Sequence, residues 1–116
     1  MTTTISHWIN GKPVSGLGTR SGDVFDPATG QVTATVSFAA REDVDAAVSA
    51  ARAAFPGWRD ASLAKRASVL FAFREILNAR RDELATIITA QHGKVLADAA
   101  GEVQRGLEVV EFACGI

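Results

Sequence analysis

The stretch GEVQRGLEVVEFACGI at the end of the chain contains its only cysteine, Cys114. A cysteine becomes nucleophilic when a helix N-terminus or a nearby cation or imidazole stabilises its thiolate. Cys114 instead follows the negative end of a predicted helix. It also continues the apolar stripe of that helix, which consists of Leu96, Ala99, Val103, Leu107, Val110 and Cys114. We therefore expect an inert core residue, because buried free cysteine behaves as a small hydrophobe.

Arg105 lies on the opposite face of the same predicted helix, and two interpretations of it are open. It could be a solvated side chain paired with Glu102 or Glu108 three residues away, which contributes only a few tenths of a kcal/mol. Alternatively, Gly101 leaves room beside the guanidinium, whose fork of donors matches a substrate carboxylate in a bidentate way. From the residues alone, the surface ion pair is the simpler interpretation.

The tetrapeptide QHGK contains two further residues that could do chemistry. His92 could act as a general base or metal ligand, but no other ligand stands at a suitable spacing, so a capping or surface role is favoured. Lys94 follows a glycine, as in phosphate-binding loops, but the full GxxxxGK[ST] motif is missing. The sequence therefore predicts no catalytic residue, no metal ligand and no cofactor-binding residue in this chain.

Helical periodicity runs from Arg41 to the end of the chain and positions these side chains. The first predicted helix begins at Arg41, and Pro56-Gly57 is expected to stop it. Its apolar face contains Val44, Ala47, Val48, Ala51 and Phe55.

The second predicted helix has Ser62 as its N-cap and runs to about Arg80. Its apolar side chains are Leu63, Ala67, Val69, Leu70, Phe71, Phe73, Ile76 and Leu77. They cover well over half of the helix circumference, and one neighbouring layer cannot bury that much surface.

Two more helices complete the predicted set. One runs from about Asp82 to Gln91, with Gly93 suited to end it in the left-handed conformation. The other runs from about Val95 to Ala113 and carries both Arg105 and the apolar stripe.

The first third of the chain has the pattern of strands and turns. In HWINGKPV the pair Asn10-Gly11 predicts a tight hairpin, because both residues tolerate a positive φ. VFDPATGQVTATVSFA predicts two strands joined by a turn at 26–30. In the second strand, apolar residues from Val32 to Phe38 alternate with Thr33, Thr35 and Ser37.

The composition is that of one globular domain. The chain has 116 residues, of which 47% are apolar and 22% charged, and its net charge is −1. No run of Lys and Arg forms the basic stripe that nucleic acid requires, and no apolar run predicts a membrane span. The opening MTTTISHW lacks the pattern of a secretion signal, and a single cysteine is compatible with a reducing cytosol. The apolar C-terminus, which has no polar tail, suggests a segment of a longer protein.

Three motifs occur in a characteristic order: the tryptophan hairpin HWINGKPV, the turn FDPATGQV, and the Gly-Lys pair after the third predicted helix. This order resembles the N-terminal region of the aldehyde dehydrogenase superfamily. The run RGLEVVEFA is most similar to the CoA-acylating methylmalonate-semialdehyde dehydrogenase branch. The resemblance covers essentially the whole chain and departs from the common pattern at Gln91, where relatives often have glutamate.

The resemblance implies an α/β fold. The chain would be the N-terminal portion of an aldehyde dehydrogenase, with β-hairpins over 1–40 and about four helices over 41–116, but without the complete Rossmann-like sheet. It would form the N-terminal segment of the NAD-binding domain region and pack around the coenzyme domain. The family's nucleophilic cysteine, general-base glutamate and glycine-rich NAD site belong to later sequence, so the catalytic domain is absent and Cys114 matches none of them.

The resemblance also implies a function for the parent enzyme. Such an enzyme oxidises methylmalonate or malonate semialdehyde with NAD and transfers the acyl group to coenzyme A, as a cytoplasmic homo-oligomer, expected to be a tetramer. In this branch an arginine at the position of Arg105 meets the substrate carboxylate, which favours substrate binding by Arg105. The chain alone is expected to be inactive and to hold no cofactor.

Two alternatives remain at this point. The chain could be a segment of another aldehyde dehydrogenase, one that oxidises a semialdehyde without coenzyme A. It could also be an independent small helical domain that binds another molecule. Neither nucleic acid nor a membrane is expected as a partner in any of these cases.

Overall fold

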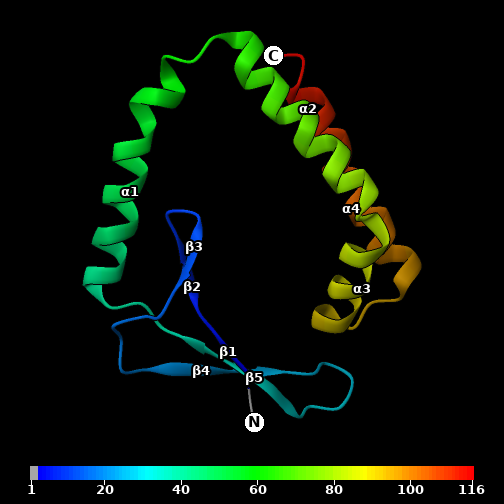
Figure 1. Ribbon diagram of the computed structural model, residues 1–116. Coiled ribbons are helices and arrows are strands. Elements are labelled where there is room, and N and C mark those ends of the chain that lie inside the picture. The colour runs from blue at the N-terminus through cyan, green and yellow to red at the C-terminus, as the bar shows by residue number, and fades with distance from the viewer. Residues whose placement is uncertain (1–2) are drawn as a thin grey trace. The chain divides into compact units, whose positions relative to one another are not determined.

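The computed structural model describes residues 3–116, which form a mixed α/β chain of short strands followed by four helices (Figure 1). The chain divides into two compact units, Met1–Asp60 and Ala61–Ile116. The first unit contains the strands β1 to β5 and the helix α1, and the second contains α2, α3 and α4. The α/β class and the four helices expected from the sequence are confirmed.

The predicted tight hairpin is present at the start of the first unit. Strands β2 (His7–Ile9) and β3 (Lys12–Val14) pair in antiparallel fashion. Between them, Asn10 has a φ of 54° and Gly11 a φ of 75°. Two successive positive φ values define the type I′ turn, whose twist matches that of the flanking strands.

A separate three-stranded sheet has the order β1-β5-β4. Strand β5 (Val32–Ser37) pairs antiparallel with β4 (Ser21–Phe25), as the sequence predicted for the strands on either side of the turn at 26–30. The Asp26 carbonyl accepts a hydrogen bond of 2.8 Å from the Gly30 N–H and so closes this turn. Strand β1 (Thr3–Ile5) adds to the other edge of β5 in parallel, a pairing that local sequence patterns do not reveal.

The predicted alternation along β5 is not matched by its burial. Ala34 and Val36 are half-buried, but so are Thr35 and Ser37, and Val32 remains 44% exposed. Strands flank β5 on both edges, yet within the described part of this unit its apolar face is not selectively buried. The alternation therefore marks a face that could be covered rather than one that is covered here.

Helix α1 (Arg41–Arg59) continues past the proline that was expected to stop it. Proline lacks an N–H and therefore removes one bond of the helical ladder. The chain still completes another turn, because the Asp60 N–H donates to the Pro56 carbonyl at 3.0 Å. The prediction that Pro56-Gly57 ends the helix was wrong by one turn.

A buried carboxylate links the start of α1 to the strands. Asp43 is 5% exposed and accepts hydrogen bonds from the backbone N–H groups of Ala40 at 2.8 Å and Leu17 at 3.0 Å. The His7 Nε2 atom of strand β2 lies 3.9 Å from the same carboxylate. The bond from Ala40 is the largest influence that lowers the pKa of Asp43 below its ordinary value, helped by Leu17 and His7 and opposed by burial.

This cluster also limits the neighbouring loop. A Cβ atom at Gly16 would lie 2.6 Å from the His7 Nε2 atom, closer than real contacts allow. Glycine at this position therefore lets the loop before Leu17 approach His7 and bring the Leu17 N–H to the Asp43 carboxylate.

The second unit consists of α2 (Leu63–Ala79), α3 (Arg81–His92) and α4 (Leu96–Ala113). The Ser62 hydroxyl accepts a hydrogen bond from the Lys65 N–H at 3.2 Å, which confirms the predicted N-cap. Gly93 ends α3 with a φ of 85°, also as predicted. Both α2 and α3 pack against α4.

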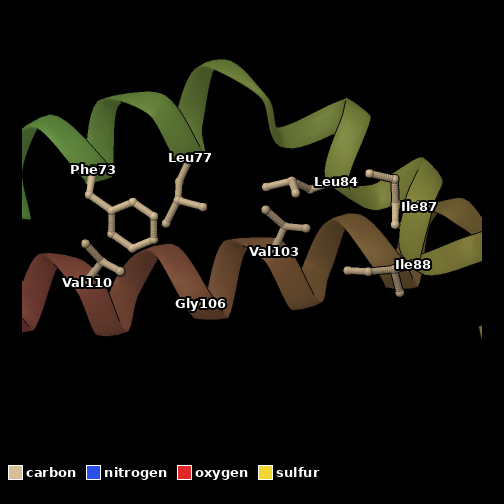
Figure 2. A pocket seen from close by; sticks show the side chains of 8 residues that line it. All are labelled: Phe73, Leu77, Leu84, Ile87, Ile88, Val103, Gly106 and Val110. Atoms are coloured by element: carbon tan, nitrogen blue, oxygen red, sulfur yellow. The ribbon is translucent and has the colours of Figure 1, made fainter. Parts of the chain in front are cut away.

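An apolar groove of about 360 Å³ runs between these three helices (Figure 2). Figure 2 shows side chains from all three helices pointing into it. Its lining residues are Phe73, Leu77, Leu84, Ile87, Ile88, Val103, Gly106 and Val110. Phe73 remains 47% exposed and Ile87 50% exposed, so the groove is only partly filled.

The described residues form little interior of their own. Among residues 3–116 the buried apolar residues are Ala85, Ala99 and Leu107, and no large side chain there is fully buried. Helix α2 has no buried residue, and Phe71 on it is 56% exposed, as expected from its wide apolar surface. Two compact bodies of half this mass would together expose about 7,300 Å², whereas the chain exposes 8605 Å². The helices therefore carry apolar surface that these two units do not cover.

We predict that Asp43→Asn lowers the urea midpoint of the first unit, measured by tryptophan fluorescence. The amide has one acceptor oxygen, whereas the carboxylate uses both, and it lacks the charge that favours a helix N-terminus. Because folding lowers the pKa of Asp43, its contribution is present above the unfolded pKa and is lost as the pH falls through the lower folded value. The difference between the two proteins should therefore begin to shrink below about pH 4 and vanish only at a lower pH, once folded Asp43 is protonated as well.

Asp45→Asn is the matched control. Asp45 lies near the start of the same helix, but its side chain is 70% exposed and its nearest cation, Arg41, is 3.8 Å away. A loss of stability as large as that of Asp43→Asn would show that the effect comes from helix charge alone and not from the buried cluster.

Candidate functional site

The orientation of α4 determines which of the candidate residues can meet another molecule. Ala99 is 0% and Leu107 3% exposed, so this stripe faces the neighbouring helices. Cys114 closes the same stripe and is half-buried, directly after the end of α4. At about 100° per residue, Arg105 then lies on the opposite side of the helix, and it is exposed as the sequence predicted.

The outer face of α4 around Arg105 is partly apolar. Val109 and Phe112, one and two turns further along, are 68% and 71% exposed. Gly101 lies one turn before Arg105, and a Cβ atom placed there would meet nothing within 4 Å. Arg105 is therefore an exposed residue on a helix face that also carries a glycine one turn before it and two exposed apolar side chains after it.

The two glutamates expected to pair with Arg105 are engaged elsewhere. Glu102 pairs with the Lys94 ammonium, and Glu108 accepts a hydrogen bond of 3.3 Å from the Gln104 amide. Within residues 3–116, no carboxylate lies within 4.0 Å of the Arg105 guanidinium. Arg105 is therefore a solvent-exposed arginine, as one of the two interpretations expected, but the ion pair with Glu102 or Glu108 is not formed within 4.0 Å.

Positive charge surrounds Glu102. The hydrogen bond from Lys94 is the main cause that lowers the pKa of Glu102 below its ordinary value, although desolvation opposes it. The charges of Lys94, His92 and Arg105 lower it further. Glu102 therefore stays ionised at neutral pH and lies in a field set by three basic side chains.

His92 and Lys94 do not form a catalytic or phosphate-binding group. His92 is exposed in the last turn of α3, which agrees with the predicted surface role. The Lys94 ammonium is held by Glu102 rather than being free to bind a phosphate. Among residues 3–116, no cluster of three or more His, Cys, Asp or Glu side chains could hold a metal ion. No helix in the part of the chain that the structure describes has the length and hydrophobicity to span a bilayer.

Sequence reasoning missed the pairing of Lys94 with Glu102. The two residues are eight positions apart and are joined across the turn at Gly93, so no helical i,i+4 rule connects them. The sequence offered one signal, the position of Lys94 directly after the helix-ending Gly93, but this position does not identify Glu102 as the partner. The Asp43 cluster was missed for the same reason, since Leu17 and His7 are distant from Asp43 in sequence.

Comparison with known proteins finds a match over most of the chain. Residues 14–116 match the model of the aldehyde dehydrogenase family. The malonate-semialdehyde dehydrogenase of Pseudomonas aeruginosa is 47% identical over 111 residues, which are 96% of this chain and 22% of that protein. Malonate-semialdehyde dehydrogenase 1 of Geobacillus kaustophilus is 45% identical over 98% of this chain and 23% of that protein.

Solved structures agree with the sequence matches. A Sinorhizobium meliloti protein assigned as a methylmalonate-semialdehyde dehydrogenase, and solved with NAD, superposes with a TM-score of 0.95 at 43% identity. The match covers 99% of this chain and 23% of that one. An aldehyde dehydrogenase of Bacillus cereus superposes with a TM-score of 0.87 at 33% identity, over 97% of this chain and 23% of that one. The chain thus spans less than a quarter of these relatives, at their N-terminal part.

We predict that Arg105→Gln leaves the stability of the chain within about 0.5 kcal/mol of the original value in urea unfolding followed by circular dichroism. Arg74→Gln is the matched comparison. Arg74 on α2 reaches Glu111 on α4 at 2.7 Å and also pairs with Glu75. Arg74→Gln should lower the urea midpoint of unfolding, because it removes the ion pair between α2 and α4. Equal losses for both variants would mean that Arg105 has a structural partner.

Proposed function

The chain belongs to the aldehyde dehydrogenase family, and we propose that it is the N-terminal segment of an NAD-dependent enzyme that oxidises malonate or methylmalonate semialdehyde to a coenzyme A thioester. The names of its relatives support this substrate class. NAD in the Sinorhizobium meliloti structure supports the redox cofactor. The segment would belong to the NAD-binding domain region of that enzyme.

The observation that carries the proposal is the free guanidinium of Arg105. A malonate or methylmalonate semialdehyde has an aldehyde at one end and an anionic carboxylate at the other. A planar guanidinium can donate two parallel hydrogen bonds to such a carboxylate. Gly101, one turn before Arg105, leaves open space on this face, and within residues 3–116 no carboxylate lies within 4.0 Å of the Arg105 guanidinium.

Recognition at one end of the substrate leaves the chemistry to other parts of the enzyme. NAD supplies a hydride acceptor and coenzyme A an acyl acceptor when they are bound. We assign neither of them to a residue of this chain, and we assign the nucleophile to sequence outside it. Binding energy from one arginine does not replace a nucleophile and a hydride acceptor, so we expect the isolated chain to be inactive.

We predict that Arg105→Leu, in a complete enzyme that carries residues 1–116 as its N-terminal segment, raises KM for malonate semialdehyde about 10- to 100-fold. This range corresponds to the loss of a hydrogen bond to a charged group, about 1.5–3 kcal/mol. Propionaldehyde has no carboxylate, so its KM should change less than twofold. Steady-state kinetics with both aldehydes measures the difference.

Arg41→Leu is the control for this experiment, because Arg41 is an arginine that is 90% exposed and belongs to α1 rather than to α4. Equal changes for both aldehydes in Arg105→Leu would return Arg105 to a structural role.

The same assays run without coenzyme A test the reaction type. Free acid formed at an undiminished rate would contradict an acylating enzyme and favour the alternative of a CoA-independent aldehyde dehydrogenase.

We predict that the 116-residue chain alone binds the dye ANS strongly and self-associates in size-exclusion chromatography. Its exposed apolar side chains, such as Phe71, Phe112 and Leu63, explain both effects. A complete enzyme containing the segment should bind far less dye for each copy of the segment. A monomer that unfolds cooperatively and binds no dye would instead support an independent small domain.

A further inference from the structure

Lys94 connects the turn after α3 to the second turn of α4. Gly93 adopts a φ of 85° and ends α3, so the next residue projects toward the start of α4. The Lys94 side chain is 20% exposed and its ammonium donates a hydrogen bond to Glu102 Oε1, whereas the Glu102 side chain is 51% exposed. The lysine is thus the more buried partner of the pair.

Glu102 is also a natural competitor for Arg105. The two residues are three positions apart on α4, a spacing at which side chains on a helix meet. The Arg105 charge already acts on Glu102. Without another partner, Glu102 would be free to pair with the guanidinium and occupy the donors that an incoming carboxylate needs.

The charges of the three side chains sum to one positive charge at neutral pH, and the ion pair determines where it lies. With Lys94 bound to Glu102, the unpaired charge belongs to Arg105, on the outer face of α4. If Lys94 were uncharged, Glu102 could neutralise Arg105 instead. A lysine suits the holding role, since its compact charge needs only one acceptor, whereas the planar fork of arginine suits two-point recognition of a carboxylate.

We propose that Lys94 is a positioning residue for substrate recognition: it holds Glu102 and thereby keeps the Arg105 guanidinium free for the carboxylate of a semialdehyde acid. This inference rests on the proposed function of Arg105. Lys94 itself does not contact the substrate in this account. Lys94 acts only through Glu102, so an experiment that also changes Glu102 can distinguish this indirect effect from direct contact with the substrate.

The test uses Lys94→Met in a complete enzyme that carries residues 1–116, because methionine keeps most of the apolar stem and removes the charge. We expect KM for malonate semialdehyde to rise about two- to fivefold, the range for an exposed ion pair formed between Glu102 and Arg105. The kcat and the KM for propionaldehyde should stay unchanged. Adding Glu102→Gln to Lys94→Met should restore the original KM, since the competitor is then neutral.

Lys65→Met is the matched control, because Lys65 is an exposed lysine on α2 that forms no ion pair within the described chain. If Lys94→Met does not fold, Lys94→Gln serves in its place with the same expected result. A KM that stays high in the double variant would overturn the proposal, because Lys94 would then act directly on the substrate. Equal rises for both aldehydes would overturn it in favour of a general structural role.

Measuring Arg105→Leu in parallel distinguishes a failure of the proposed function of Arg105 from a failure of the proposed role of Lys94. If Arg105→Leu does not discriminate between the aldehydes, the proposed function fails. If Arg105→Leu discriminates but Lys94→Met leaves KM for malonate semialdehyde unchanged, only the positioning role of Lys94 fails.

Discussion

The packing of α4 against α2 and α3 is the constraint on which the candidate site depends. Ala99 and Leu107 are almost fully buried, and their small or branched side chains allow close contact with the neighbouring helices. A helix fixed along one stripe cannot rotate, so the opposite stripe is fixed too. Arg105 lies on that opposite stripe and is exposed, while Glu102, three residues before it, is paired with Lys94.

The same three helices also leave much of their apolar surface exposed. The groove in Figure 2 is lined by apolar side chains from three helices, yet several of them remain half-exposed. Phe112 and Val109 are exposed on the outer face of α4, beside Arg105. Relatives are more than four times as long as this chain. Additional sequence of that kind would cover apolar surface that the two units leave open, and it would supply the chemistry that we do not assign to the chain.

The sequence correctly predicted those turns and helix ends that depend only on the preferences of the residues at that place. Asn10-Gly11, Ser62 and Gly93 each act through their own backbone preferences, and each does so where expected. The effect of Pro56 was predicted wrongly, because a proline ends a helix only if the next turn cannot form its hydrogen bonds. Here the next turn does form, with the Asp60 N–H bonded to the Pro56 carbonyl. The amphipathic stripe of α4 placed Arg105 on the correct face, but the sequence did not show that Glu102 pairs with Lys94 instead of Arg105. That contact crosses a turn between two helices, and helical periodicity does not report it.

The central claim is that Arg105 contacts the carboxylate of a short semialdehyde acid. The most direct measurement is a crystal structure of a complete enzyme containing this segment, bound to the unreactive dianion malonate. The account predicts that both outer nitrogens of Arg105 lie about 2.7–2.9 Å from one carboxylate of malonate, while Lys94 remains paired with Glu102. Arg105 paired with a protein carboxylate, with malonate bound by other residues, would contradict it.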